Sequence, residues 1–145
     1  IEAALVRVKA PGRFERLGYK PDLYVDVGHN PHAAKWLSER LQVLKSKSQK
    51  VHAVYAALED KDVEGVVHAM TSVVDQWYLA GLDVPRGLGS ETLWARLESA
   101  PLLHTSTHDT VLDAIAAAKA GAVTEDIIIV FGSFFTVAEA RRLLL

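Results

Sequence analysis

The sequence predicts an α/β fold, a three-layer sandwich whose six-stranded sheet is mostly parallel with one antiparallel strand. Two observations predict this fold. Apolar, β-branched stretches alternate with helical patterns of about 10 to 15 residues, which is typical of parallel βαβ units with right-handed crossovers. Only a short turn joins the first two strand-like pieces, so one of them must be antiparallel to its neighbour. Because no repeat, low-complexity stretch or linker divides residues 1–145, we predict a single domain.

The first predicted elements form a hairpin followed by a helix. Strand-like pieces at residues 14–17 and 23–27 flank a connection whose Gly18 and Pro21-Asp22 favour a turn. Asn30 is a good N-cap and Pro31 suits the first helical position, where its missing N–H is not needed. Apolar residues then recur at helical spacing: Ala34, Leu37, Leu41 and Leu44.

The remaining elements continue the alternation. Strands are predicted at residues 51–58, 76–80, 102–105 and 126–131, and helices at about 62–74, 91–98, 109–120 and 136–145. Asp62 is the expected cap of the second helix, and Ser106 and Thr107 offer caps to the helix that begins at 109. Gly121 is expected to close that helix in the left-handed conformation. The β-branched run at 126–131 indicates a central strand buried on both faces.

Composition excludes several functional classes. The net charge is -2, from 16 basic and 18 acidic residues that are scattered along the chain, so neither a nucleic-acid nor a membrane-surface footprint is present. Without cysteine the chain has no disulfide, thiol nucleophile or Cys-based zinc site. No signal peptide opens the chain, and we expect a cytoplasmic monomer. The chain starts at Ile1 and its only methionine is Met70, so we expect a fragment of a longer protein.

Polar residues follow three of the predicted strands. They occupy residues 26–30, 59–62 and 132–136. In open α/β sheets, ligands bind outside the carboxyl ends of the strands, so these segments are expected to converge on one edge. Arg13 is expected to reach the same region after Pro11-Gly12 turns the chain.

These segments carry a resemblance. It rests on Pro11-Gly12-Arg13-Phe14, on the run from Asp26 to Ala34 that includes His29-Asn30-Pro31-His32, on Asp60-Lys61-Asp62, and on Gly132-Ser133-Phe134-Phe135-Thr136-Val137-Ala138. In order and spacing the series resembles the folylpolyglutamate synthase family of ATP-dependent Mur-type ligases, over essentially the whole chain. Val27-Gly28 and Phe135 depart from the family pattern, which often has His at the latter position.

The resemblance implies a two-domain enzyme. This chain would be the C-terminal, Rossmann-like domain of the Mur ligase type, while an N-terminal domain absent from it would carry the P-loop, the Mg²⁺ ligands and a carbamylated lysine. The enzyme would use ATP to phosphorylate a carboxylate of dihydropteroate or of a folate glutamate tail, and the amine of L-glutamate would attack the acyl phosphate. The isolated domain would be inactive.

Residue roles follow from the same resemblance. Arg13, Asp26, His29 and Asn30 would contact ATP, with Arg13 and His29 at the phosphates and Asp26 at the ribose. His29 would also be the catalytic residue. Ser133 and Lys61 would position glutamate. These residue types suit the chemistry, since an arginine fork matches phosphate and a carboxylate accepts hydrogen bonds from hydroxyls.

Simpler readings remain open for each residue. Asn30-Pro31 is in any case a helix start, Asp26 has an alternative role as an acceptor of turn amides, and Lys61 has one as part of a solvated loop. The histidine pairs at 29/32 and 104/108 have metal-like spacing, but zinc is not expected. The chain contains no P-loop motif. A muramyl peptide ligase domain and a non-catalytic Rossmann-like binding module are the alternative functions.

Overall fold

A computed structural model describes residues 12–47, 49–100, 102 and 104–144, which form six strands and five helices. The strands are β1 (Glu15–Gly18), β2 (Asp22–Asp26), β3 (Val51–Tyr55), β4 (Gln76–Ala80), β5 (Thr105–His108) and β6 (Ile127–Phe131). The helices are α2 (Pro31–Leu44), α3 (Val63–Met70), α4 (Ser90–Arg96), α5 (Val111–Gly121) and α6 (Phe134–Leu144). Across these ranges no helix has both the length and the apolar character needed to span a membrane.

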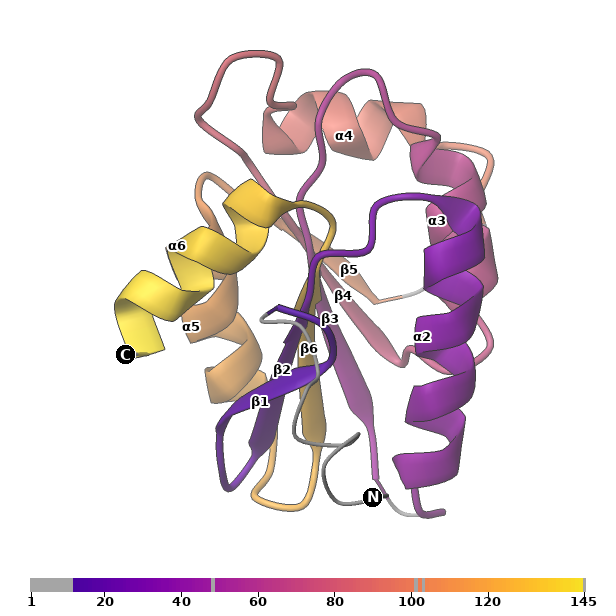
Figure 1. The fold of residues 1–145 in the computed structure, drawn as a ribbon, viewed down its shortest axis with the longest axis vertical. Helices are drawn as coiled ribbons and strands as arrows, with labels where there is room; N and C mark the ends of the chain where they lie inside the picture. The colour runs from indigo at the N-terminus through magenta and orange to yellow at the C-terminus, as the bar shows by residue number, and fades with distance from the viewer. Residues whose placement is uncertain (1–11, 48, 101, 103, 145) are drawn as a thin grey trace, which may run out of the picture.

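All six strands belong to one sheet, in the order β1-β2-β6-β3-β4-β5. β1 pairs antiparallel with β2, and every other neighbouring pair is parallel. Figure 1 shows α2 and α3 on one side of the sheet and α5 and α6 on the other. The predicted three-layer fold and its single antiparallel strand are therefore confirmed.

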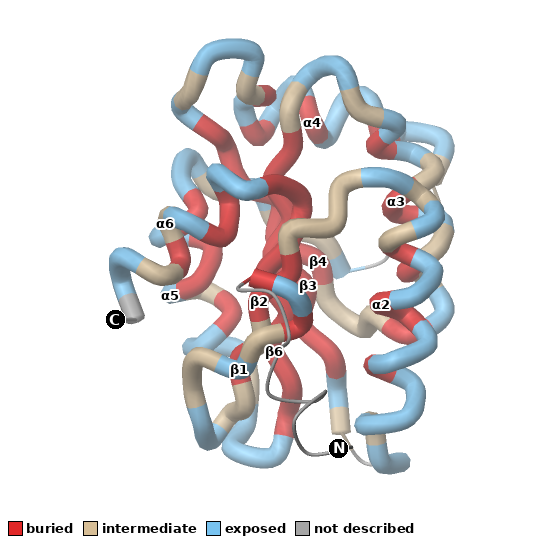
Figure 2. The backbone as a smooth tube through the Cα atoms, viewed as in Figure 1, coloured by how far each residue is buried: buried red, intermediate tan, exposed pale blue. Residues whose placement is uncertain are grey.

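The sheet has a core on each face, and β6 contributes to both. Its residues alternate, with Ile127, Ile129 and Phe131 facing the core that α2, α3 and α4 cover. Ile128 and Val130 face the core that α5 and α6 cover. Both sets are buried, so the continuous apolar run reflects burial on two faces rather than one. Figure 2 shows the buried backbone concentrated in the central strands and the exposed backbone on the outer helices and loops.

Three sequence predictions need correction. The fifth strand runs from Thr105 to His108 instead of covering 102–105, and Pro101 and Leu103 lie outside the described residues. Ser106 and Thr107 consequently belong to this strand, and Thr110 caps α5 by accepting a hydrogen bond from the Asp113 amide. Gly121 is the last residue of α5 and lacks the positive φ that was predicted.

The helix ends also differ from the prediction. α6 begins at Phe134, two residues before the predicted start, because Ser133 supplies its cap. α3 ends at Met70 rather than near 74. The predicted caps of α2 and α3 are confirmed: the Asn30 side chain accepts from the Ala33 amide, and that of Asp62 accepts from the Gly65 amide.

A buried polar network joins β3, β4 and the start of β6. The Nε2 atom of His52 lies 2.9 Å from Oδ2 of Asp126, and its Nδ1 lies 2.9 Å from the Tyr78 hydroxyl. Both contacts are satisfied when the imidazole donates from Nε2 to Asp126 and accepts at Nδ1 from the Tyr78 hydroxyl. Burial and the nearby Asp126 charge raise the pKa of Tyr78, so its hydroxyl keeps the proton that it donates. His52 is thus a structural residue at the end of the sheet opposite the polar loops.

The Tyr55 hydroxyl is buried without a partner among the residues that the structure describes. Its ring stacks on Phe131 with centroids 4.8 Å apart and meets Trp77 edge-on at 6.4 Å. Burial, the largest cause, raises the pKa of Tyr55 far above its ordinary value. The aromatic contacts account for the residue, but the hydroxyl carries an uncompensated desolvation cost.

We therefore expect Tyr55→Phe to raise the free energy of unfolding by about 1 kcal/mol, because the ring contacts survive and the unpaired hydroxyl is removed. Urea denaturation of this chain measures the change. Tyr78→Phe is the matched control and should be destabilising, since the Tyr78 hydroxyl bonds to His52. A loss of stability in Tyr55→Phe as large as that in the control would show that the Tyr55 hydroxyl is satisfied.

Candidate functional site

The candidate site lies at the carboxyl ends of β2, β6 and β3. These strands are neighbours in that order, so the three polar segments predicted to converge do end at one edge. The helix after β6 packs on the opposite face from the helices after β2 and β3. Such a reversal opens a crevice above the strand ends, which is where open α/β sheets bind ligands.

Asp26, the last residue of β2, is 1% exposed and holds the loop that precedes β1. Its Oδ2 accepts from the Phe14 amide at 2.9 Å, and its Oδ1 accepts from the Gly28 amide at 2.7 Å. The Val27 amide adds a hydrogen bond to the Gly12 carbonyl at 2.8 Å. The carboxylate accepts the turn amide of Gly28, as the simpler reading of this residue supposed, and its bond to the Phe14 amide also ties two chain segments together.

Arg13 lies on the outside of the same loop. Its side chain is 47% exposed, and its Nε is 3.9 Å from Oδ2 of Asp26. The guanidinium also lies over the ring of Trp36, 5.9 Å from the ring centroid, and Arg40 approaches that ring at 5.6 Å. Sequence reasoning did not assign Trp36 to the site, because an aromatic residue in an amphipathic helix carries no signal of its neighbours. Arg13 is thus oriented by a carboxylate and a ring while its donors remain open to solvent.

His29 and Asn30 form the entry to α2. The Asn30 side chain accepts from the Ala33 amide at 2.8 Å, and Pro31 occupies the first helical position. His29 is half-buried, with Nδ1 3.3 Å from the Val27 carbonyl oxygen. This contact orients the ring beside the positive end of the helix dipole. An anion above His29 would therefore contact the imidazole and lie near the N-terminus of α2.

Ser133 connects β6 to α6 and is 4% exposed. Its Oγ accepts from the Thr136 amide at 3.0 Å and lies 2.8 Å from the Thr136 hydroxyl, which donates to the Ala56 carbonyl at 3.1 Å. Gly132 precedes it with φ of 128°, and a Cβ at that position would overlap the Ala56 carbonyl oxygen. The serine hydroxyl is therefore an N-cap in this structure.

The first turn of α6 presents two aromatic side chains outward. Phe134 is 72% exposed and Phe135 is 45% exposed. Phe134 also lines a mainly apolar hollow of about 170 Å³, together with Gly12, Val27, Val137, Ala138 and Arg141. Phe135, the departure from the family pattern, thus offers the site edge an apolar surface in place of an imidazole.

Lys61 lies in the loop between β3 and α3. Its side chain is half-buried, its amide donates to the Leu58 carbonyl, and its carbonyl accepts from Nη2 of Arg96 at 2.8 Å. Asp62 follows as the cap of α3. The sequence indicated Lys61 by its place after a strand, but it gave no sign of the contact with Arg96, which lies 35 residues further along the chain.

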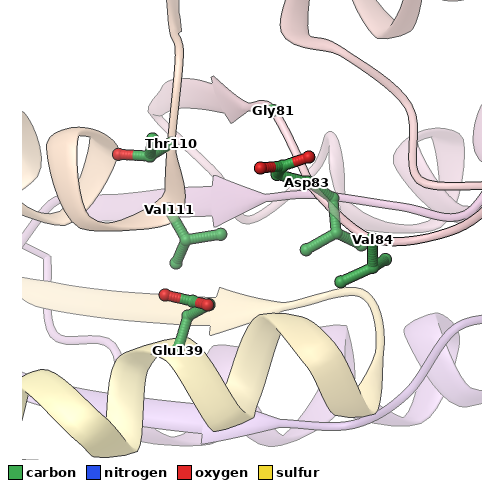
Figure 3. A pocket seen from close by; sticks show the side chains of 7 residues that line it. Gly81, Asp83, Val84, Thr110, Val111 and Glu139 are labelled. Carbon is green, nitrogen blue, oxygen red and sulfur yellow. The ribbon is translucent and has the colours of Figure 1, made fainter.

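A second pocket, of about 210 Å³, lies near the ends of β4 and β5. Figure 3 shows Asp83 and Glu139 beside Thr110 and the apolar side chains of Val84 and Val111. Glu139 pairs with Arg142. Sequence reasoning missed this pocket, since its lining comes from the loop after β4, the start of α5 and a residue of α6, without a shared motif.

Across the described ranges, no group of three or more His, Asp or Glu side chains is placed to hold a metal ion. Residues 12–134 match the family model described as Mur ligase, glutamate ligase domain. This chain belongs to that family. The predicted resemblance to Mur-type folate ligases is confirmed.

The similar proteins are folate enzymes. The chain is 43% identical over 121 residues to the dihydrofolate synthase/folylpolyglutamate synthase of Haemophilus influenzae, covering 82% of this chain and 28% of that protein. It is 41% identical over 134 residues to the Escherichia coli enzyme of the same name, covering 92% of this chain and 30% of that protein. The chain therefore spans about a third of the length of these relatives.

Solved structures of the same class of enzyme also match this chain. E. coli FolC in complex with DHPP and ADP superposes with a TM-score of 0.83 at 40% identity, over 92% of this chain and 31% of that one. A bifunctional folylpolyglutamate synthase/dihydrofolate synthase with Mn, AMPPNP and L-glutamate bound gives 0.85 at 38% identity, over 94% and 32%. This domain is thus homologous to the C-terminal region of dihydrofolate synthase/folylpolyglutamate synthase.

Proposed function

We propose that this chain is the domain of an ATP-dependent ligase that contacts the nucleotide and receives L-glutamate. The complete enzyme would join glutamate to dihydropteroate, to folate glutamate tails, or to both. The observation that carries the proposal is the match to the E. coli enzyme across 92% of the chain, with the candidate residues gathered at the ends of three adjacent strands. An N-terminal domain outside this chain would supply the P-loop and the Mg²⁺ ligands.

The chemistry divides into two steps. The acceptor carboxylate would attack the γ-phosphorus of ATP, giving an acyl phosphate and ADP. The deprotonated amine of glutamate would then attack the acyl carbon, form the amide and release inorganic phosphate. Both steps depend on positioning and on stabilising phosphate charge rather than on covalent catalysis by the protein.

Arg13, His29 and Asn30 are the proposed phosphate-facing residues. Arg13 combines an exposed guanidinium with two orienting contacts, to Asp26 and Trp36. His29 lies at the positive end of α2, where backbone amides favour an anion. Asn30 holds that helix start in place. When the two domains close, Arg13 would neutralise phosphate charge and His29 would lie near the phosphates.

Asp26, Ser133 and Lys61 are proposed to act closer to the sheet. Asp26 already bonds to two amides and is buried, so a hydrogen bond from the ribose requires the loop at 12–14 to open. Ser133 likewise must exchange a capping contact for one with glutamate. Lys61 supplies a positive charge suited to a glutamate carboxylate.

The test uses the complete protein that carries this chain. Incubated with ATP, Mg²⁺, L-glutamate and dihydropteroate, it is expected to release phosphate and form dihydrofolate, detected by mass spectrometry. The 145-residue chain alone is expected to form none. Phosphate release only with a UDP-linked muramyl acceptor would favour the muramyl peptide ligase alternative. Absence of phosphate release with either acceptor would favour the non-catalytic binding module.

A further inference from the structure

Arg96, the last residue of α4, donates two hydrogen bonds to the loop that carries Lys61. Its Nη1 donates to the Glu59 carbonyl at 2.9 Å, and its Nη2 donates to the Lys61 carbonyl at 2.8 Å. One rigid, planar guanidinium therefore spans the loop and fixes two of its peptide groups at once. The donor comes from a helix that is neither the element before the loop nor the one after it.

Segment 86–88 holds the same loop from a second side. The Glu59 amide donates to the Arg86 carbonyl at 2.7 Å, and the Leu88 amide donates to the Ala57 carbonyl at 3.0 Å. Leu58 and Gly87 form an isolated antiparallel bridge. These contacts fix the start of the loop. Lys61 itself bonds through its amide to the Leu58 carbonyl and through its carbonyl to the Val63 amide. Arg96 adds to these local bonds a contact from outside the loop.

The position of Arg96 favours an effect on geometry over one on global stability. Arg96 is exposed. Exposed charged contacts contribute little to the free energy of unfolding, because water and salt screen them. A peptide group held at its carbonyl nevertheless has a fixed orientation, and the Cα–Cβ bond of Lys61 is attached to it. Small errors in the placement of a binding group reduce occupancy and rate steeply.

We propose that Arg96 is a positioning residue for the glutamate site: it holds the loop at 59–62 so that Lys61 faces the incoming amino acid. This rests on the function proposed above, in which Lys61 contacts glutamate. Arg96 itself touches no substrate. It acts through the two carbonyl oxygens, so a residue outside the motif series would set the affinity for glutamate.

The experiment compares Arg96→Ala, Arg96→Lys and the control Arg142→Ala in the complete ligase. Arg142 is also an exposed arginine, but it pairs with Glu139 of its own helix, α6. For Arg96→Ala we expect the KM for glutamate to rise about tenfold while the KM for ATP changes less than twofold. Arg96→Lys, with one ammonium in place of a fork, should give an intermediate KM for glutamate. The control should resemble the wild type.

Amide hydrogen exchange provides a readout that does not depend on turnover. Exchange in the segment 59–63 should accelerate in Arg96→Ala and not in Arg142→Ala, while the urea midpoint of both variants stays near that of the wild type. Unchanged exchange, or a KM for ATP that rises as much as that for glutamate, would overturn the proposal. If Arg96→Ala proves unstable, Arg96→Lys carries the same comparison.

A double-mutant cycle separates this proposal from the role of Lys61. If Arg96 acts through Lys61, adding Arg96→Ala to Lys61→Ala should raise the KM for glutamate no further. An additive rise would refute the link between them. A Lys61→Ala variant with normal kinetics for glutamate would instead refute the function proposed for Lys61, whereas accelerated exchange in Arg96→Ala would still locate the restraint in the loop.

Discussion

Replacing Asp26 by alanine should lower the free energy of unfolding by about 3 kcal/mol, because a buried acceptor is lost and the amides that it satisfied remain. The carboxylate is 1% exposed and accepts hydrogen bonds from the Phe14 and Gly28 amides. Urea denaturation of this chain measures the loss. Asp22→Ala is the control in the same strand. Asp22 forms a solvent-exposed ion pair with Arg16 at 3.6 Å, and its replacement should cost below about 1 kcal/mol.

Variants of Asp26 and Arg13 distinguish a structural role from a ligand-binding role. In the complete enzyme, Asp26→Ala should also weaken ATP use, because the loop that carries Arg13 is released. Arg13→Ala should weaken ATP use without the loss of stability, since this side chain is 47% exposed. Steady-state kinetics in ATP, set beside the urea midpoints, distinguishes the two variants. Asp26→Ala as stable as the wild type would contradict the anchoring role assigned to its carboxylate.

Replacing Asp126 by alanine should also cost about 3 kcal/mol, for a different set of partners. The Asp126 carboxylate accepts from His52 Nε2 at 2.9 Å and from the amides of Lys50 and Val123 at 3.1 Å each. Its removal leaves the buried His52 imidazole and the two amides without this acceptor. Glu125→Ala is the matched control, because that neighbouring side chain is exposed and should change the unfolding free energy by less than about 0.5 kcal/mol.

Asp126 also makes stability depend on pH. Burial acts to raise its pKa, but the hydrogen bonds from His52 and from the two amides outweigh burial and hold the pKa below its ordinary value. The stabilisation is therefore complete above the pKa of the unfolded chain, about 4, and is lost as the pH falls through the lower folded-state pKa. Urea titrations from pH 7 to pH 2.5 should show the difference between wild type and Asp126→Ala shrinking only below about pH 4. A constant difference would exclude this carboxylate as the titrating group.

Local signals predicted much of the fold. The starts of α2 and α3 follow from Asn30-Pro31 and Asp62, whose side chains bond to amides within three residues. The apolar runs of β3 and β6 predicted buried central strands. β5 was misplaced because its residues, Thr105–His108, are polar, and an edge strand with one neighbour needs no apolar run.

Contacts in the site between residues far apart in the sequence left no local signal. The motif segments were visible in the sequence, and their strand ends do lie together. In contrast, the contact of Trp36 with Arg13 and the bonds from Arg96 to the loop at 59–62 depend on which helices pack side by side. Ser133 shows that prediction is limited even within a single motif. The family resemblance implied that it positions glutamate, and only the structure shows that its hydroxyl caps α6.

The place of β6 in the sheet has a consequence for biosynthesis. This strand separates β2 from β3, yet it comes last of the described strands along the chain. Until it leaves the ribosome, two central strands have unpaired backbone groups along their inner edges and part of each core lacks its cover. Non-local pairing of this kind is slow. Nascent chains that stop before Asp126 should therefore be clients of chaperones, and a truncated domain must keep β6 to fold.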